Sequence, residues 1–157
     1  MDNLTITKEN ALKAYQEGCP DVKKVLSNLF GDKTFVSEKI TDRIKTYEDA
    51  CDILGLGKDN QVKVSHDMSK DEKSIKAYAK LIVVIRALNE GWEPDWDNSS
   101  QYKYYNYWDM RKGFSFFGVA YDWTFTAVGS RLCFKTEELS KYAAKQFEQL
   151  YREFYTI

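Results

Sequence analysis

The chain has 157 residues, which is enough for one globular domain of ordinary size with a small appendage. Its 23 Lys and Arg residues nearly balance 24 Asp and Glu residues, so it lacks the positive field that drives binding to long duplex nucleic acid. Its longest apolar run, residues 81–85, is far shorter than the ~20 residues that span a bilayer, so we expect no membrane segment.

The N-terminal part predicts three short helices. Thr7 caps a helix over 8–17, and a second helix with helical spacing of its apolar residues follows over 20–30. Thr46 then caps a third helix, over 47–54, with acidic residues in its first turn. None is long enough to be stable alone in water, so we expect a small lobe or arm that gains its stability by packing.

A longer helix is predicted over 69–90. Ser69 is followed three residues later by Glu72, which is the pattern of a capping box, and Gly91 marks the end. Its apolar residues recur every three or four positions and form one broad face, which we expect to lie in the core: Ile75, Tyr78, Ala79, Ile82, Ile85 and Leu88.

Three strand-like segments follow, over 102–108, 114–123 and 131–134, and Thr136 then caps a last helix over 137–155. The predicted fold class is α+β, with a three-stranded antiparallel meander packed against two long helices and preceded by a small helical N-terminal lobe. The division falls after residue 55, giving a lobe of residues 1–55 and an α+β domain of residues 56–157. We expect five side chains to be buried between helices and sheet: Ile82, Ile85, Leu139, Phe147 and Leu150.

The segment from Tyr102 to Phe125 holds 11 of the chain's 24 aromatic residues. Because successive side chains of a strand point to opposite faces, both faces of the predicted hairpin are aromatic. Three interpretations remain open: a second layer covers the outer face and makes the hairpin core, the face joins copies of a homo-oligomer, or it is a ligand platform. Tyr and Trp favour surfaces that are alternately wet and covered, and we expect a homo-oligomer.

Four cations and five carboxylates lie between Trp92 and Phe134, a balance unsuited to a long polyanion. It suits a compact ligand with a flat ring and one or two phosphates, such as a small nucleotide, held by stacking and an arginine. The candidate ligand-binding residues are Trp92, Trp96, Tyr104, Tyr105, Tyr107, Trp108, Arg111, Tyr121, Trp123 and Arg131.

No motif for catalysis, a metal or a cofactor is present, so we expect a protein that is not an enzyme. The glycines at 55 and 57 lack the spacing of a phosphate loop, and the one histidine, His66, stands in a polar segment without a second metal ligand. The three cysteines are widely scattered, which is typical of free, buried thiols in a reducing cytosol.

Two stretches, ALNEGWEPDWDNSSQYKYYNYWDM and VGSRLCFKTEELSKYAAKQFEQLYREFYTI, resemble uncharacterised proteins encoded by phages and prophages of anaerobic gut bacteria. KTYEDACDILG resembles a segment upstream in the same proteins, so the resemblance covers roughly residues 40–157. It carries no catalytic residue onto this chain. It implies a phage origin and action in the host cytoplasm or the virion.

Small non-catalytic phage proteins suggest two functions. The first is to bind and withhold a small nucleotide that signals antiviral defence in the bacterial cytosol. The alternative is a structural or assembly protein whose aromatic hairpin is a protein interface. A third class binds single-stranded DNA or an enzyme of the host. The balanced charge disfavours DNA binding, and the absence of a fibrous repeat disfavours a tail fibre, so the sequence favours the first function.

Overall fold

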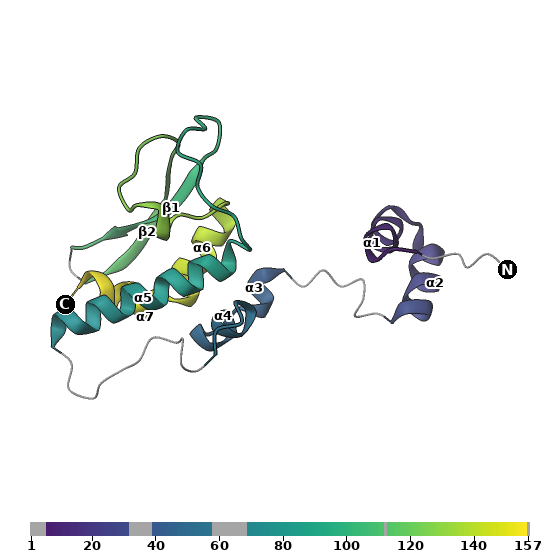
Figure 1. Cartoon of the computed structure of the whole chain (residues 1–157), viewed down its shortest axis with the longest axis horizontal. Coiled ribbons are helices and arrows are strands. Elements are labelled where there is room, and N and C mark those ends of the chain that lie inside the picture. Colours follow the sequence, from purple (N-terminus) through teal and green to yellow (C-terminus); the bar gives the residue numbers. More distant parts are fainter. Residues whose placement is uncertain (1–5, 32–38, 58–68, 112, 157) are drawn as a thin grey trace. The chain divides into compact units, whose positions relative to one another are not determined.

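The computed structural model describes residues 6–31, 39–57, 69–111 and 113–156 (Figure 1). The chain divides into two compact units, Met1–Lys39 and Ile40–Ile157. The first unit holds two short helices, and the second holds the remaining helices and the sheet. The sequence interpretation placed this division later, after residue 55.

The first unit consists of α1 (Lys8–Glu17) and α2 (Pro20–Phe30). The Thr7 hydroxyl accepts a hydrogen bond from the backbone N–H of Asn10 at 3.2 Å and caps α1 as predicted. Ala11 is the one buried side chain among the described residues of this unit. Two short helices with so little buried area have almost no core of their own.

The second unit is an α+β fold built around one long helix. Its elements are α3 (Ile40–Arg43), α4 (Tyr47–Ile53), α5 (Lys70–Leu88), β1 (Lys103–Asp109), β2 (Ser115–Asp122), η3 (Ser130–Leu132), α6 (Glu137–Gln146) and α7 (Glu148–Tyr155). Helix α5 packs against α4 and α7, and α6 packs against both strands (Figure 1).

The predicted helix starts are confirmed by their caps. Ser69 and Glu72 form the capping box of α5, with the Ser69 N–H donating to the Glu72 carboxylate at 2.7 Å. Thr46 and Asp49 form a second capping box at the start of α4, and the Thr136 hydroxyl caps α6. These signals are local in sequence, so they can be read without knowledge of the tertiary structure.

One apolar cluster forms the core of the second unit, with α5 at its centre. Of the five side chains predicted to lie in the core, Ile85, Leu139 and Phe147 are buried, whereas Ile82 and Leu150 are only partly buried. The buried members from α3 to α5 include Ile40, Ile44, Tyr47, Ala50, Cys51, Leu81, Val84 and Leu88. Helices α3 and α4 therefore supply part of the same core as α5.

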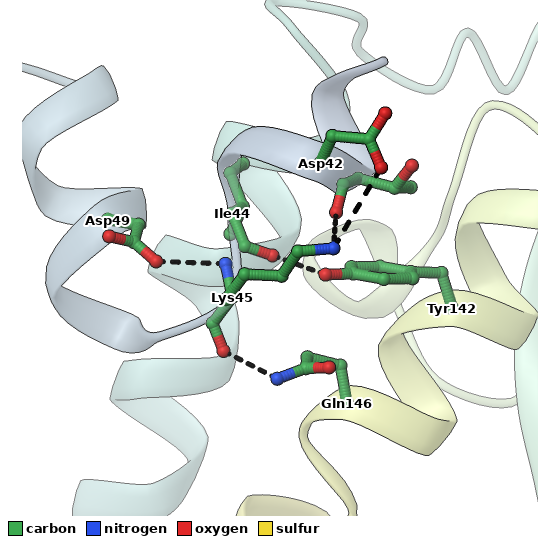
Figure 2. Close-up of polar contacts among 7 residues, drawn as sticks. Asp42, Ile44, Lys45, Asp49, Tyr142 and Gln146 are labelled. Carbon is green, nitrogen blue, oxygen red and sulfur yellow. Dashed lines mark hydrogen bonds and ion pairs between the residues drawn. The ribbon is translucent and has the colours of Figure 1, made fainter. Parts of the chain in front are cut away.

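Figure 2 shows how the segment between α3 and α4 is attached to α6. The Tyr142 hydroxyl donates to the backbone carbonyl of Ile44, and the Gln146 side-chain amide donates to the carbonyl of Lys45 at 2.7 Å. The Lys45 N–H in turn donates to the Asp49 carboxylate at 2.9 Å. Residues 40–55, which the sequence interpretation grouped with the N-terminal lobe, thus pack within the second unit.

The sheet has two strands, so the predicted three-stranded meander is wrong. β1 and β2 pair antiparallel along their lengths, with one bulge opposite Tyr107 and Trp108. The predicted third strand, residues 131–134, begins inside the 3-10 turn η3. From this segment Phe134 alone forms a bridge with Tyr104.

The elements on either side of Phe134 limit it to a single bridge. Its backbone N–H and C=O both bond to Tyr104, but η3 ends at Leu132 and α6 begins at Glu137, so the extended segment is short. On the edge away from β1, the side-chain amide of the buried Asn89 donates to the carbonyl of Cys133 at 2.8 Å. The side-chain oxygen of Asn89 accepts from the backbone N–H of Lys135 at 3.1 Å, so Asn89 fixes this segment to the end of α5.

The last predicted helix, over 137–155, is divided at Phe147, where the backbone is not helical (φ −118°, ψ 26°). The division lets α6 pack on the hairpin while α7 packs on α5. The sequence carries neither Gly nor Pro at this point, and its apolar spacing continues through the break. The second of the two predicted long helices is therefore two short ones.

Candidate ligand-binding cleft

The two faces of the hairpin have different surroundings. On the inner face, the Ser140 hydroxyl of α6 donates to the side-chain oxygen of Asn106 at 2.6 Å, and the ring of Trp108 lies 4.9 Å from that of Tyr151 in α7. Trp108 also stacks on Phe114 with ring centroids 4.3 Å apart. Trp108, a predicted ligand residue, is therefore part of the packing between hairpin and helices.

The loop before β1 is held by a buried lysine that the sequence interpretation did not single out. Lys103 is fully buried, and its ammonium donates to the backbone carbonyls of Asn98 at 3.1 Å and Trp123 at 2.8 Å. The same ammonium lies 5.3 Å from the ring centre of Trp96. The indole N–H of Trp96 donates to the Ser130 hydroxyl at 2.8 Å. Lys103 thus joins the loops on either side of the hairpin.

Tyr105 and Tyr107 alternate with the inner-face residues of β1. The Tyr105 hydroxyl donates to the Asp122 carboxylate at 3.1 Å, and burial together with this hydrogen bond raises the pKa of Tyr105. Tyr107 is exposed and lies edge-on to Phe117 with centroids 6.0 Å apart. Tyr105 is thus engaged within the hairpin, whereas Tyr107 is open to solvent.

A further group of rings lies where the hairpin meets the loops. Tyr121 stands opposite Tyr104 in the sheet register, and their ring centroids are 5.9 Å apart. Tyr102 lies 4.9 Å from Tyr121, and Trp123 lies 6.3 Å from Tyr121. These aromatic residues form one continuous cluster, of which Tyr102, Tyr121 and Trp123 are exposed.

Arg111, at the tip of the hairpin, is engaged with Asp109. Its guanidinium makes two hydrogen bonds to the Asp109 carboxylate, at 3.1 and 2.9 Å. This contact raises the pKa of Arg111 and lowers that of Asp109. An exposed pair of this kind organises the turn rather than a pocket, and Arg111 is not among the residues that line the cleft described next.

A cleft of about 600 Å³ lies between the C-terminal half of α5 and the turn at residues 129–131. Its lining residues are Tyr78, Ile82, Ile85, Arg86, Asn89, Trp92, Glu93, Pro94, Gly129, Ser130 and Arg131. We call it the α5 cleft. Of the predicted ligand residues it unites Trp92 and Arg131, and Trp96 is bonded to its wall through Ser130.

Two arginines give the α5 cleft its charge. Arg86 and Arg131 are exposed, and neither forms an ion pair or hydrogen bond with any other residue that the structure describes. Glu93 is the one carboxylate in the lining, so the cleft carries a net positive charge. Arg86 also stands in the last turn of α5, where a cation is favoured by the helix dipole.

Sequence reasoning missed Arg86, although the signal was present. Ile82, Arg86 and Asn89 follow one another at spacings of four and three residues, so they share one face of α5. That face ends beside Trp92, which starts the loop leading to β1. The fold then brings the 129–131 turn to the same face through the Asn89 hydrogen bonds to the segment that follows it.

The described part of the chain contains no group of three or more His, Cys, Asp or Glu side chains placed to hold a metal ion. His66 lies outside the described residues. Among the described helices, none combines the length and the apolar character of a membrane span.

No protein-family model, no curated protein and no solved structure matches the chain. The resemblance to phage proteins therefore stays a prediction. The α5 cleft and the exposed aromatic side chains of the hairpin are the two features from which a function can be inferred.

Proposed function

We propose that this protein is a non-catalytic phage protein that binds a small nucleotide in the α5 cleft. Its role would be to withhold a nucleotide signal of antiviral defence in the cytosol of the bacterial host. The observation that carries the proposal is the meeting of Trp92 with Arg86 and Arg131 around one cleft, where neither arginine side chain is paired with another described residue. Phage origin and host location rest on the sequence resemblance alone.

The composition of the cleft suits such a ligand. A volume of about 600 Å³ is ample for a mononucleotide and lies within the range of small-molecule sites. The indole of Trp92 offers a flat face to a base, and stacking of this kind is worth ~1–3 kcal/mol per base. Arg131 presents a guanidinium that forms no ion pair with a carboxylate of the described residues, and it suits a phosphate in a two-point contact.

Binding without catalysis is sufficient for this role. The cleft lining holds one carboxylate, Glu93, and no His or Cys, so it offers no evident acid–base pair or nucleophile. A nucleotide held there would be withheld and released unchanged.

The test is a panel of mono-, di- and cyclic nucleotides, scored by thermal stabilisation and then by calorimetry. A ligand at 100 times its Kd should add ~2.7 kcal/mol to the free energy of unfolding. Trp92→Ala should weaken binding about 5- to 150-fold, the range that corresponds to a lost stacking contact. Arg131→Gln should lower the affinity for nucleotides far more than the affinity for the corresponding nucleosides, because it removes a phosphate contact.

Arg111→Gln is the matched control, because this exposed arginine lies outside the α5 cleft and bonds to Asp109. It should leave nucleotide affinity unchanged. The proposal fails if no nucleotide of the panel shifts the melting temperature, or if Trp92→Ala and the parent protein bind a nucleotide equally well.

A second candidate function is supported by the aromatic surface, which we define by its exposed side chains: Tyr102, Tyr107, Met110, Phe117, Tyr121, Trp123 and Phe125. They belong to the hairpin and the residues next to it, and Tyr107 and Tyr121 lie on opposite faces of the sheet. Exposed apolar side chains concentrated on one element are typical of protein interfaces. A structural or assembly protein of the phage would use this surface and need no ligand. Copurification with phage particles, without stabilisation by any nucleotide, is the result that would favour this function.

A further inference from the structure

The outer edge of β2 has no strand beside it. β1 separates β2 from the bridging residue Phe134, and no other strand in the described part of the chain pairs with β2. An edge of this kind presents a row of backbone N–H and C=O groups that another strand can complete. The chemistry of the edge therefore requires an extended backbone as its partner.

The side chains around this edge are apolar and uncovered. Phe117 is 70% exposed and Phe125 is 77% exposed, and Tyr121 and Trp123 are also exposed. At Gly118 a methyl group would meet no atom within 4 Å, so the face of the sheet is open there. Natural edge strands are protected by charged residues or bulges; residues 115–121 contain no charged residue, and the one bulge of the pair lies at Phe117.

The charges at the two ends of β2 favour a second copy as the partner. Asp122 ends the strand, and the cation Arg111 precedes it in the hairpin turn. In an antiparallel pair related by a twofold axis, the start of one strand meets the end of the other. The hairpin turn of each copy, in which Arg111 and Lys112 outnumber the one carboxylate of Asp109, then lies at the same end as Asp122 of its partner.

Parallel pairing lacks this advantage, because it would place the two Asp122 carboxylates side by side. Antiparallel pairing of an eight-residue strand instead keeps them roughly 25 Å apart, well beyond the screening length at physiological salt. The uncharged residues 116–121 of the two copies then lie opposite one another in reverse order, without repulsion.

We propose that two copies of this chain pair antiparallel through β2 and form one continuous four-stranded sheet. The pairing covers part of the aromatic surface and leaves its other exposed side chains at the margins of the interface. It does not depend on a ligand in the α5 cleft, whose lining includes no residue of β2.

The experiment measures the molar mass of the full chain by light scattering at micromolar to tens of micromolar concentration. The parent protein should give twice the 18.4 kDa of one chain. Phe117→Lys should reduce the mass to that of one chain, because it places a charge on each copy beside the twofold axis. Ile75→Lys is the matched control: Ile75 is 67% exposed on α5, away from the sheet, and its change should leave the dimer intact.

A spin label at Ser115→Cys, in a Cys19→Ser background, reports the orientation. The two labels should lie ~25 Å apart in the antiparallel pair and near 5 Å in a parallel one. A parent protein of 18.4 kDa throughout the concentration range would overturn the inference. A dimer that survives Phe117→Lys would also overturn it. If circular dichroism shows that Phe117→Lys is unfolded, Tyr121→Lys takes its place, and a folded Tyr121→Lys that remains dimeric would overturn the inference.

Discussion

Cys19 and Cys133 carry the same thiol in opposite surroundings. Cys19 is exposed at the N-cap of α2, where the backbone N–H groups of Val22 and Asp21 lower the pKa of its thiol. Cys133 is 1% exposed, and burial raises the pKa of its thiol to about 11. The sequence predicted free, buried thiols, which is wrong for Cys19; it could not rank the thiols, because burial of Cys133 depends on loops distant in the chain.

We predict that alkylation of the native protein at pH 8 modifies Cys19 first. A thiol with a pKa of about 11 is ionised in about one molecule in a thousand at that pH, and Cys133 is also inaccessible. Cys51, which is buried, should likewise react only after denaturation. Peptide mass spectrometry over a time course measures each rate, and modification of Cys133 as fast as that of Cys19 would contradict the assigned burial.

At the scale of elements, Asn89 fixes residues 133–135 to the end of α5. Its side chain satisfies the carbonyl of Cys133 and the N–H of Lys135, which lie on the edge away from β1 and would otherwise need other partners. Asn89 follows α5 by one residue, so from the sequence it reads as an ordinary residue at a helix end. Its partners lie 44 and 46 residues further on, and no local pattern contains that information.

Asn89→Ala should destabilise the second unit by about 2–4 kcal/mol, because two buried backbone groups lose their hydrogen bonds. Urea unfolding followed by circular dichroism gives the change in free energy. Asn98→Ala is the control, since Asn98 makes an exposed hydrogen bond to Ser100 within one turn and its loss should cost less than about 0.5 kcal/mol. An equal effect of the two changes would show that the Asn89 hydrogen bonds do not hold this segment.

The elements that were correctly predicted share a local origin. The capping pair of Ser69 and Glu72 and the turn between the two strands each lie within a few residues. The division of the last helix at Phe147 has a different cause, because α6 and α7 pack on different partners and the sequence pattern is continuous through it. Likewise, Trp92 and Arg131 could be proposed as ligand residues from their type, but Arg86 joined them only through the fold.

At the scale of the whole molecule, the position of α3 and α4 distinguishes two ways of dividing the chain. The sequence placed the division after residue 55, on the basis of Gly55 and the loop composition. In the structure Ile44, Ala50 and Cys51 are fully buried in the cluster centred on α5. A fragment beginning at residue 56 therefore lacks part of the core, whereas one beginning at residue 40 keeps it.

We predict that fragment 40–157 folds cooperatively and melts within a few degrees of the full chain, because the first unit contributes almost no described core. Fragment 56–157 should be unfolded or prone to aggregation. Each fully buried large side chain that it lacks is worth about 1.5–3 kcal/mol, so the loss of Ile44 and its neighbours in the core approaches the ~5–15 kcal/mol that stabilises a whole domain. It also loses the backbone carbonyl that accepts from Tyr142.

Thermal melts by circular dichroism compare the two fragments with the full chain at equal concentration. Tyr142→Phe in fragment 40–157 adds a graded check, because it removes one hydrogen bond to Ile44 and keeps the ring, so its melting temperature should fall by several degrees without loss of cooperativity. If fragment 56–157 melts as the full chain does, α3 and α4 are dispensable and the division after residue 55 is the better description. If fragment 56–157 does not melt as the full chain does, α3 and α4 belong to the same cooperative unit as α5. The α5 cleft then depends on α3 and α4, because they stabilise the helix that forms its wall.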